Sequence, residues 1–503
     1  MDTLSYATLE KIGYDSYLVT KDAPEKVLQF GEGNFLRAFV DRYVDLANEA
    51  TGWNGRVVLV QPRGTHPEAA DAMNAADGLY TVLVRGNEGG ATVDEARVIS
   101  SCSRCLNPYR AADYAALMEV ATSDALELVV SNTTEAGIAY DASCRPTDEP
   151  PASFPAKLAQ VLHARWGAGK PGVVVLSCEL IDHNGAELLR IVKRHAADWG
   201  WGPAFSAWLE RDCAFCTTLV DSIVPGRIRD ASEAASVEER LGYADPFLVV
   251  REPFQMWGIE GSDELAAKLP FVAAGLPGVF VTPDVTPYKK RKVRILNGAH
   301  TGFVPAAWLA GLDIVRDCMH DTAVRSFMDA MLQREVIPTL AGELDRADLE
   351  AFAAAVADRF DNPFIDHALL SICLNSTAKW AARDLPTLLD YVEATGALPP
   401  CLTMSLAALI AFYTTGLEGR GADGLHLRRP DGTAYVASDD ASVLDFYEAH
   451  TGEKDEALVA AALANEGFWG RDLTAVPGLA AAVVADLALI REKGAHAALA
   501  SCR

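Results

Sequence analysis

Short runs of Val, Leu and Phe alternate with segments of helical periodicity over roughly the first 200 residues. The runs are almost continuously apolar, which is typical of parallel strands that are buried on both faces. The segments between them repeat their apolar residues every three or four positions, as helices do. This alternation predicts an α/β fold, with a parallel sheet that helices cover on both faces. The strands are expected in 26–30, 56–62, 126–137 and 172–181, further extended segments at 79–84 and 96–100, and helices at 35–50, 111–123 and 185–199.

The pattern changes after residues 278–288. Strand-like runs nearly vanish there, and long segments rich in Ala and Leu follow, such as 456–469 and 480–500. Pro283 and Pro287 interrupt regular strand pairing at the change. We therefore expect two domains: residues 1–285 with the parallel sheet, and residues 286–503 as an all-helical domain.

Composition narrows the class of protein. Half of the 503 residues are apolar and 22% are charged, so the chain can build a large core. The formal net charge of -25 argues against general affinity for nucleic acid, because phosphate backbones repel an acidic surface. The longest apolar segment, 402–413, is shorter than the roughly 20 residues of a membrane helix, so we expect a buried helix. No apolar signal region follows the amino terminus, and a cytoplasmic protein is expected.

Ten cysteines are scattered along the chain, which favours reduced thiols. Two CxxC pairs occur, Cys102 with Cys105 and Cys213 with Cys216. They lie far apart in the sequence, whereas structural zinc sites use much closer ligand spacing. The sequence therefore predicts no metal, although a zinc site built from both pairs stays an alternative.

A glycine-rich turn follows the first expected strand. Gly31 permits a tight turn, and Gly33 would let a pyrophosphate approach the backbone before a helix begins. Leu36 stands where the third glycine of the usual dinucleotide fingerprint would be. After the second strand come Gln61 and Arg63 instead of the acidic residue that binds the adenosine ribose. An ordinary strand–helix turn therefore remains an alternative, and Arg63 could meet a 2′-phosphate.

Residues 288–301, YKKRKVRILNGAHT, concentrate positive charge in an acidic chain, since five of the six positions from 289 to 294 are cationic. Three interpretations compete: a nucleic-acid or nuclear-localisation patch, a solvated helix face, and a catalytic site for an anionic substrate. On an α-helix over 289–305, Lys292, Asn297 and His300 would lie at angles of about 0°, 140° and 80°. They could then line one cleft, where a lysine exchanges the hydroxyl proton while an amide and an imidazole stabilise the developing oxyanion.

Several segments together resemble the mannitol dehydrogenase family of polyol-specific long-chain dehydrogenases. The matching segments are GEGNFLRAF (31–39), SNTTEAG (131–137), SCELIDHNG (177–185), TLVDSIVP (218–225), EPFQMWGIE (252–260) and TPYKKRKVRILNGAHT (286–301). The Lys-x4-Asn-x2-His spacing is specific to that family. The resemblance implies a Rossmann-type amino-terminal domain and a mostly α-helical carboxy-terminal domain. It also implies hydride transfer with NAD and no metal, and a small-molecule sugar-acid substrate, with neither nucleic acid nor membrane as a partner. The oligomeric state stays open, and a monomer is compatible with the sequence.

The same resemblance implies roles for individual residues. Lys292 would be the general acid/base, Asn297 would polarise the substrate oxygen, and His300 would bind or orient the substrate. The implied substrate-binding residues are Asp221, Lys379, Asn184 and Glu135. The implied cofactor-binding residues are Phe30, Gly31, Gly33, Asn34, Phe35 and Asn132.

Two positions depart from the mannitol enzymes. Leu180 replaces an Asn of the oxyanion site, for which Asn184 could compensate, and Ser371 replaces an expected Arg. Both changes fall where polyol contacts would be made, and they favour a branch that acts on a keto sugar acid. Candidates for its carboxylate are Lys379, Arg294 and Arg37. Another keto-uronate, a polyol such as mannitol, and a cofactor-sensing protein without turnover remain alternatives.

Overall fold

The computed structural model of the chain describes residues 1–64 and 67–502. It divides into two compact units. Unit 1 comprises Met1–Arg85 and Val93–Val285, and unit 2 comprises Gly86–Thr92 and Thr286–Arg503. The chain therefore passes between the units three times, and the short segment 86–92 belongs to the unit that is otherwise built from the second half of the sequence.

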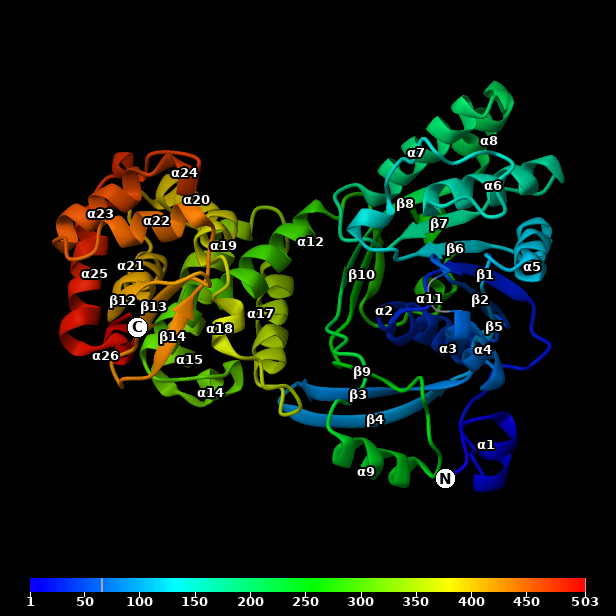
Figure 1. Cartoon of the computed structure of the whole chain (residues 1–503), viewed down its shortest axis with the longest axis horizontal. Helices are drawn as coiled ribbons and strands as arrows, with labels where there is room; N and C mark the ends of the chain where they lie inside the picture. Colours follow the sequence, from blue (N-terminus) through cyan, green and yellow to red (C-terminus); the bar gives the residue numbers. More distant parts are fainter. Residues whose placement is uncertain (65–66, 503) are drawn as a thin grey trace. The chain divides into compact units, whose positions relative to one another are not determined.

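Unit 1 contains an eight-stranded sheet in the order β11-β10-β8-β7-β6-β1-β2-β5 (Figure 1). Its strands are β1 (Glu25–Phe30), β2 (Arg56–Val60), β5 (Cys102–Leu106), β6 (Leu128–Ser131), β7 (Val174–Ser177), β8 (Ala214–Asp221), β10 (Met256–Glu260) and β11 (Val279–Thr282). The six strands from β5 to β8 are parallel, whereas β10 runs antiparallel to β8. The order 5-2-1-6-7-8 reverses between β1 and β6, as in doubly wound dinucleotide-binding sheets. The predicted parallel α/β fold is confirmed.

Helices cover both faces of this sheet because successive strand residues point to opposite sides. On one face Val27 and Leu59 pack with Phe39 and Tyr43 in one apolar cluster. On the other face Leu28 belongs to a second apolar cluster. The helices of unit 1 are α1 (Tyr6–Ile12), α2 (Asn34–Ala38), α3 (Val40–Thr51), α4 (Pro67–Ala75), α5 (Ala111–Thr122), α6 (Phe154–Gly167), α7 (Asn184–Asp198), α8 (Gly202–Asp212), α9 (Ala231–Leu241), α10 (Asp263–Ala266) and α11 (Pro270–Ala273), with a 3-10 turn η1 (Glu135–Gly137).

Two local expectations need correction. The helix predicted for 35–50 is broken at Phe39, whose φ of -113° and ψ of -72° leave the regular helical range, so α2 and α3 are separate. The extended segments at 79–84 and 96–100 do form strands, β3 (Tyr80–Glu88) and β4 (Ala91–Ile99), but these lie outside the main sheet. They pair with β9 (Val249–Arg251) in a three-stranded sheet of the order β4-β3-β9.

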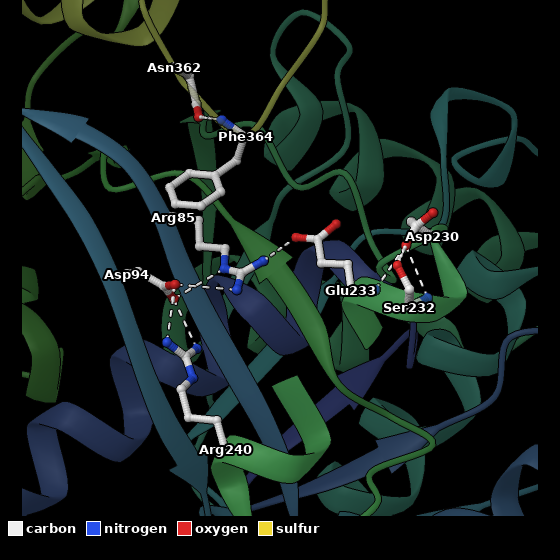
Figure 2. A network of polar contacts seen from close by, with 8 residues as sticks. All are labelled: Arg85, Asp94, Asp230, Ser232, Glu233, Arg240, Asn362 and Phe364. Carbon is white, nitrogen blue, oxygen red and sulfur yellow. Dashed lines mark hydrogen bonds and ion pairs between the residues drawn. The ribbon is translucent and has the colours of Figure 1, made fainter. Parts of the chain in front are cut away.

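An ion-pair network ties this smaller sheet to helix α9 (Figure 2). Arg85 on β3 binds Asp94 on β4 through Nε at 3.1 Å, and it also contacts Glu233 on α9 at 2.6 Å. Arg240 reaches the same Asp94 from α9 at 3.0 Å. Hydrogen bonds from the two guanidinium groups hold the pKa of Asp94 below its usual value despite its partial burial. The network fixes the base of the β3–β4 hairpin within unit 1, and the tip of that hairpin is the segment 86–92 of unit 2.

Unit 2 is built mainly from helices around the buried helix α21. Its helices are α12 (Thr286–Arg291), α13 (Gly298–Leu309), α14 (Val315–His320), α15 (Thr322–Ala330), α16 (Ile337–Leu340), α17 (Arg346–Phe360), α18 (Leu369–Ile372), α19 (Ser376–Arg383), α20 (Leu385–Thr395), α21 (Pro400–Thr414), α22 (Ala441–Ala449), α23 (Asp455–Ala464), α24 (Glu466–Trp469), α25 (Leu479–Lys493) and α26 (Ala495–Ser501), with a 3-10 turn η4 (Leu473–Ala475). The buried carboxylate of Glu335 accepts hydrogen bonds from the backbone N–H groups of Cys401 and Leu402, and so satisfies free donors at the start of α21. The expected buried helix at 402–413 is confirmed, and no helix in 1–64 or 67–502 is long and apolar enough to cross a membrane.

The expectation of an all-helical second half is wrong in one element. Three short strands, β12 (Leu417–Arg420), β13 (Leu425–Arg428) and β14 (Ala434–Ala437), form an antiparallel sheet in unit 2. Leu425 and Leu427 are buried, while the intervening residue and the following one are exposed. This alternation marks a strand that is buried on one face, but four residues are too few to stand out in a sequence dominated by helical patterns.

Candidate active site

The glycine turn lies where the strand order of the main sheet reverses. Gly31 follows β1 with a φ of +123°, a backbone conformation that side chains with a Cβ rarely adopt. A Cβ on Gly31 would lie 3.0 Å from Cδ1 of Leu36 and 3.1 Å from the backbone oxygen of Asn132. Gly33 caps α2, and no atom beyond its chain neighbours lies within 4 Å of the position that its Cβ would take. The turn is therefore closely packed around Gly31, whereas the space beside Gly33 is open.

A carboxylate lies at the end of β2, although the sequence after β2 contains none. Gln61, which follows β2, donates from Nε2 to Oε1 of Glu32 at 3.2 Å. Glu32 is the residue between Gly31 and Gly33. The turn itself thus supplies an acidic group at the position where dinucleotide-binding folds hold the ribose diol. The residues that follow the second strand do not reveal Glu32, because Glu32 comes close to Gln61 only when β1 pairs with β2.

The remaining residues of the predicted cofactor group have different surroundings. The side chain of Phe30 is fully buried in the core, with its ring 5.0 Å from that of Phe154, and its predicted contact with a cofactor stays a prediction. Phe35 stacks on Phe39 at 5.0 Å and also packs against the core. Asn132 is half-buried at the end of β6 and donates to the backbone oxygen of Cys178 at 3.2 Å.

Asn34 and Arg37 hold the first turn of α2. The exposed Asn34 accepts a hydrogen bond at its Oδ1 from Nη2 of Arg37 at 2.8 Å. Arg37 is buried and also donates to the backbone oxygens of Glu32, at 3.0 Å, and Phe247, at 2.5 Å. Since the guanidinium serves backbone oxygens, the suggestion that Arg37 binds a substrate carboxylate is wrong.

Asn184, the first residue of α7, is a structural residue. Its Nδ2 donates to the backbone oxygens of Glu179, at 2.8 Å, and Thr218, at 3.0 Å. Its Oδ1 accepts from the backbone N–H groups of Gly185, at 2.8 Å, and Thr218, at 2.9 Å. These four bonds use both N–H groups and both lone pairs of the buried amide. The structure thus supports a structural role for Asn184, and its predicted part in the oxyanion site stays a prediction.

Just after β7 lies a buried carboxylate, Glu179, that no local sequence pattern marks. Glu179 accepts hydrogen bonds from the hydroxyl of Ser131, at 3.1 Å, and the backbone N–H of Thr133, at 3.0 Å, while burial raises its pKa. It thereby joins the ends of β6 and β7. The neighbouring Leu180 is 63% exposed, which places an apolar side chain where the mannitol enzymes have an amide.

Two predicted substrate residues of unit 1 lie near these strand ends. Asp221 is the last residue of β8 and is buried, with Met256 of β10 as its register partner. Glu135 begins the 3-10 turn η1, and its side chain lies outside the described part of the structure. Their predicted roles stay predictions.

In unit 2, Lys292 and Asn297 are the first and last residues of a π-helix, η2 (Lys292–Asn297), which continues directly into α13. The predicted helix over 289–305 is correct as a continuous helical segment, but its geometry is not α-helical throughout. In a π-helix the backbone bonds residue i to residue i+5, so the turn is wider than in an α-helix. The separation of about 140° expected for two residues five positions apart is therefore reduced, and both half-buried side chains start from the same widened turn.

Directly after this turn, Gly298 packs against a buried acid. Its Cβ position would lie 2.8 Å from Oδ1 of Asp384, the residue that follows α19. Burial raises the pKa of Asp384 well above its usual value. The absence of a side chain at Gly298 thus lets the helix of Lys292 and Asn297 lie directly on α19.

We expect Gly298→Ala to lower the free energy of unfolding and kcat together. Alanine improves helix propensity by about 1 kcal/mol, but overpacking against the buried Asp384 costs about 1–3 kcal/mol and displaces η2. Urea unfolding and steady-state kinetics measure the two effects. Gly342→Ala is the matched control because no atom lies within 4 Å of its Cβ position. Equal losses for Gly298→Ala in the wild type and in an Asp384→Ala background would contradict the clash.

His300, on α13, is an uncharged histidine in a basic setting. Its ring stacks on Phe360 at 3.9 Å and meets His367 edge-on at 5.5 Å. Burial, followed by the nearby cations that include Arg383 and Lys379, holds its pKa well below the usual value. Its Nε2 is buried and has no hydrogen-bond partner among the described residues. Such an atom can exchange a hydrogen bond with a ligand without carrying charge.

Three other cations of the basic segment have acidic partners within unit 2. Lys290 pairs with Glu343, and Arg291 pairs with Asp348. Arg294 is buried and pairs with Asp390 at 2.5 Å. The proposed use of Arg294 for a substrate carboxylate is therefore wrong. Much of the positive charge in this segment therefore takes part in structural ion pairs around the helix that carries Lys292.

A cavity of about 840 Å³ in unit 1 lies at the opposite edge of the sheet from the glycine turn. Its lining includes Leu128, Val174 and Ala214, the first residues of β6, β7 and β8. Doubly wound sheets bind ligands at the carboxyl ends of their strands, so this cavity is separate from the candidate cofactor site. Within residues 1–64 and 67–502, no group of three or more His, Cys, Asp and Glu side chains could hold a metal ion. The CxxC pairs lie on or next to strands β5 and β8 as free thiols.

A doubly wound sheet joined to a mostly helical unit is the organisation of a two-domain dehydrogenase. Residues 25–271 match the Mannitol dehydrogenase Rossmann domain, and residues 284–491 match the Mannitol dehydrogenase C-terminal domain. The altronate oxidoreductase of Klebsiella pneumoniae (strain 342) is 44% identical over 482 residues, which cover 94% of this chain and 95% of that protein. The chain belongs to the mannitol dehydrogenase family, and it is an oxidoreductase that acts on CH–OH groups.

Solved structures agree on the fold. The crystal structure of a D-sorbitol dehydrogenase in substrate-free form matches with a TM-score of 0.80 and 22% identity, over 99% of this chain and 100% of that one. The mannitol 2-dehydrogenase of Pseudomonas fluorescens, in a ternary complex with NAD and D-mannitol, matches with a TM-score of 0.65 and 24% identity, over 99% and 98% of the chains. The predicted family, with its Rossmann-type and mostly helical parts, is confirmed.

Proposed function

We propose that this protein reduces D-tagaturonate to D-altronate with NADH, and catalyses the reverse oxidation, in the breakdown of hexuronates. The observation that carries this proposal is the 44% identity, over nearly the whole length, to relatives named altronate oxidoreductase. The departures at Leu180 and Ser371 from the mannitol enzymes support a substrate other than mannitol. A fructuronate reductase or a polyol 2-dehydrogenase of the same family is the alternative function.

The residues of unit 1 fit a dinucleotide. The open side of Gly33 would admit a pyrophosphate, and Glu32 at the end of β2 would accept hydrogen bonds from a ribose diol. NADH supplies the hydride for the keto carbon when it is bound. No metal is needed in this scheme, because the polarisation of the carbonyl falls to protein donors.

The residues of unit 2 would handle the substrate oxygen. Lys292 donates a proton from Nζ to the carbonyl oxygen as the alcohol forms, and takes it back in the oxidation direction. The amide of Asn297 donates a hydrogen bond to the oxygen as negative charge develops there. His300, held neutral by its surroundings, orients the substrate through its buried Nε2.

A substrate screen tests the function. NADH consumption is measured with D-tagaturonate, D-fructuronate and D-fructose at equal concentrations, with NADPH in parallel. We expect the highest kcat/KM for D-tagaturonate with NADH. A preference for D-fructuronate or D-fructose would select the alternative function, and a higher kcat/KM with NADPH would contradict the assignment of NAD.

We expect Glu32→Gln to weaken the discrimination against NADPH by about tenfold, which corresponds to about 1.4 kcal/mol. The carboxylate would repel a 2′-phosphate, and the amide would not. The ratio of kcat/KM for NADH to that for NADPH is the measurement, and Glu10→Gln on the exposed face of α1 is the control. An unchanged ratio would show that Glu32 does not face the ribose.

We also propose a cytoplasmic location and a catalytically competent monomer. The ten cysteines are free thiols, which agrees with a reducing compartment. Size-exclusion chromatography with light scattering, at the concentrations used for kinetics, tests the oligomeric state.

A further inference from the structure

Two cations lie side by side on the short helix α19. Lys379 and Arg383 are four positions apart, so their side chains share one face of the helix. Their hydrogen bonds go to neutral oxygens. Lys379 donates from Nζ to the backbone oxygen of Ile372 at 2.9 Å, and Arg383 donates from Nη1 to the hydroxyl of Thr301 at 3.0 Å.

The contact with Thr301 connects Arg383 to the candidate catalytic helix. Thr301 follows His300, and its hydroxyl donates to the backbone oxygen of Asn297 at 3.0 Å. The chain of bonds from Arg383 through Thr301 to Asn297 therefore positions the guanidinium beside two of the three signature residues. His300 belongs to the same cluster as Arg383, Thr301 and Asn297, because the charge of Arg383 acts on its ring. Its Nε2 is buried and has no hydrogen-bond partner among the described residues.

The charges of this group do not balance. Burial lowers the pKa of both Lys379 and Arg383. The positive charge of Arg383 lowers the pKa of Lys379 further. Asp384 follows Arg383 directly in the sequence, but its Oδ2 is buried without a hydrogen-bond partner among the described residues, and burial raises the pKa of its carboxyl group. Asp439 already accepts hydrogen bonds from the backbone N–H of Thr377, at 3.1 Å, and the hydroxyl of Tyr413. In a chain with a net charge of -25, two adjacent cations whose hydrogen bonds within residues 1–64 and 67–502 go to neutral oxygens form a local exception.

We propose that Arg383, together with Lys379, binds the carboxylate of the substrate and thereby selects sugar acids over neutral sugars. A guanidinium presents parallel N–H groups that match the two oxygens of a carboxylate, and it stays protonated at any physiological pH. The arginine that the family resemblance leads us to expect at position 371 is a serine on α18 in this chain, so the arginine of this site is instead the last residue of α19. This inference rests on the proposed function, because it assigns the acidic end of that substrate.

The test compares a charged and a neutral ketose and includes a binding measurement. In Arg383→Ala we expect kcat/KM for D-tagaturonate to fall roughly 10- to 100-fold, the range for a lost hydrogen bond to a charged group. The value for D-tagatose, which lacks the carboxylate, should change less than about twofold. Binding of D-altronate to the NAD-loaded protein, measured by calorimetry, should weaken by the same factor as D-tagaturonate reduction. Arg383→Lys should recover part of both losses, and Arg325→Ala, an exposed arginine of the same unit, serves as the control.

Two outcomes overturn the inference: equal losses for D-tagaturonate and D-tagatose, or unchanged D-altronate binding in Arg383→Ala. A failure of the proposed function looks different, because the wild-type protein would then prefer another ketose. If that ketose is another keto-uronate, its own reduced acid replaces D-altronate in the binding measurement, and the same two outcomes decide about Arg383. A wild-type preference for a neutral ketose overturns both proposals.

Discussion

Lys292→Ala is expected to lower kcat for D-tagaturonate reduction by about 10²- to 10⁴-fold, the usual contribution of a positioned general acid or base. Lys292 is the first residue of the π-helical turn that ends at Asn297. Of the three signature residues, it is the one that we expect to donate a proton from its charged form. His300 cannot replace it, because burial and the surrounding cations keep the imidazole neutral. Single-turnover kinetics with NADH measures the chemical step apart from product release.

Lys290→Ala is the matched control for this prediction. Lys290 lies on the preceding helix and pairs with Glu343 near the surface, so its loss should change kcat less than about twofold, as is usual for exposed ion pairs. If Lys292→Ala kept the wild-type kcat and the Lys290→Ala variant lost it, the assignment of the general acid would be wrong. An external primary amine that restores part of the activity of Lys292→Ala would support the missing ammonium as the cause.

Gly31→Ala is expected to destabilise the protein by about 2–6 kcal/mol. The residue has a φ of +123°, where a Cβ costs of order 1–3 kcal/mol in strain. The added methyl group would also meet Leu36 and the backbone of Asn132 at 3.0 and 3.1 Å, which costs about 1–3 kcal/mol in overpacking. Urea unfolding followed by tryptophan fluorescence gives the change in the free energy of unfolding.

Gly33→Ala separates this structural effect from cofactor binding. Its φ of -67° suits alanine, and open space surrounds the position of the new methyl group. We therefore expect unchanged stability but a rise in KM for NADH of about tenfold, or about 1.4 kcal/mol, because the methyl would occupy the space proposed for the pyrophosphate. If Gly33→Ala bound NADH normally, the cofactor would not approach this turn, whatever the stability of Gly31→Ala.

Much of the fold could be predicted because local burial leaves a local pattern. Continuous apolar runs at 26–30 and 56–62 predicted β1 and β2, and both strands are buried on two faces. The same argument missed the sheet β12–β14, whose strands are only four residues long. It also predicted a uniform α-helix where η2 is a π-helix, because the insertion of one residue into a turn leaves no change in the apolar pattern.

The candidate site could be predicted in part. The spacing of Lys292, Asn297 and His300 predicted one continuous helical segment, which the structure contains and to which we assign the proposed chemistry. The structure bonds Asn184 and Arg37 to protein atoms for one reason: both are buried, and a buried polar group is bonded wherever the fold offers a partner. Those partners are backbone atoms of distant segments, which no local pattern identifies.

The amino-acid sequence by itself determined the parallel sheet, the glycine turn, the helical second half and the family signature, since each depends on the order of neighbouring residues. The tertiary structure alone decided which charges are neutralised. It pairs Arg294 with Asp390 and leaves Arg383 on a neutral hydroxyl, and it brings Glu32 to the end of β2. Electrostatic energy depends on distance in space and on burial, and the chain sets both only when segments far apart in sequence fold against one another.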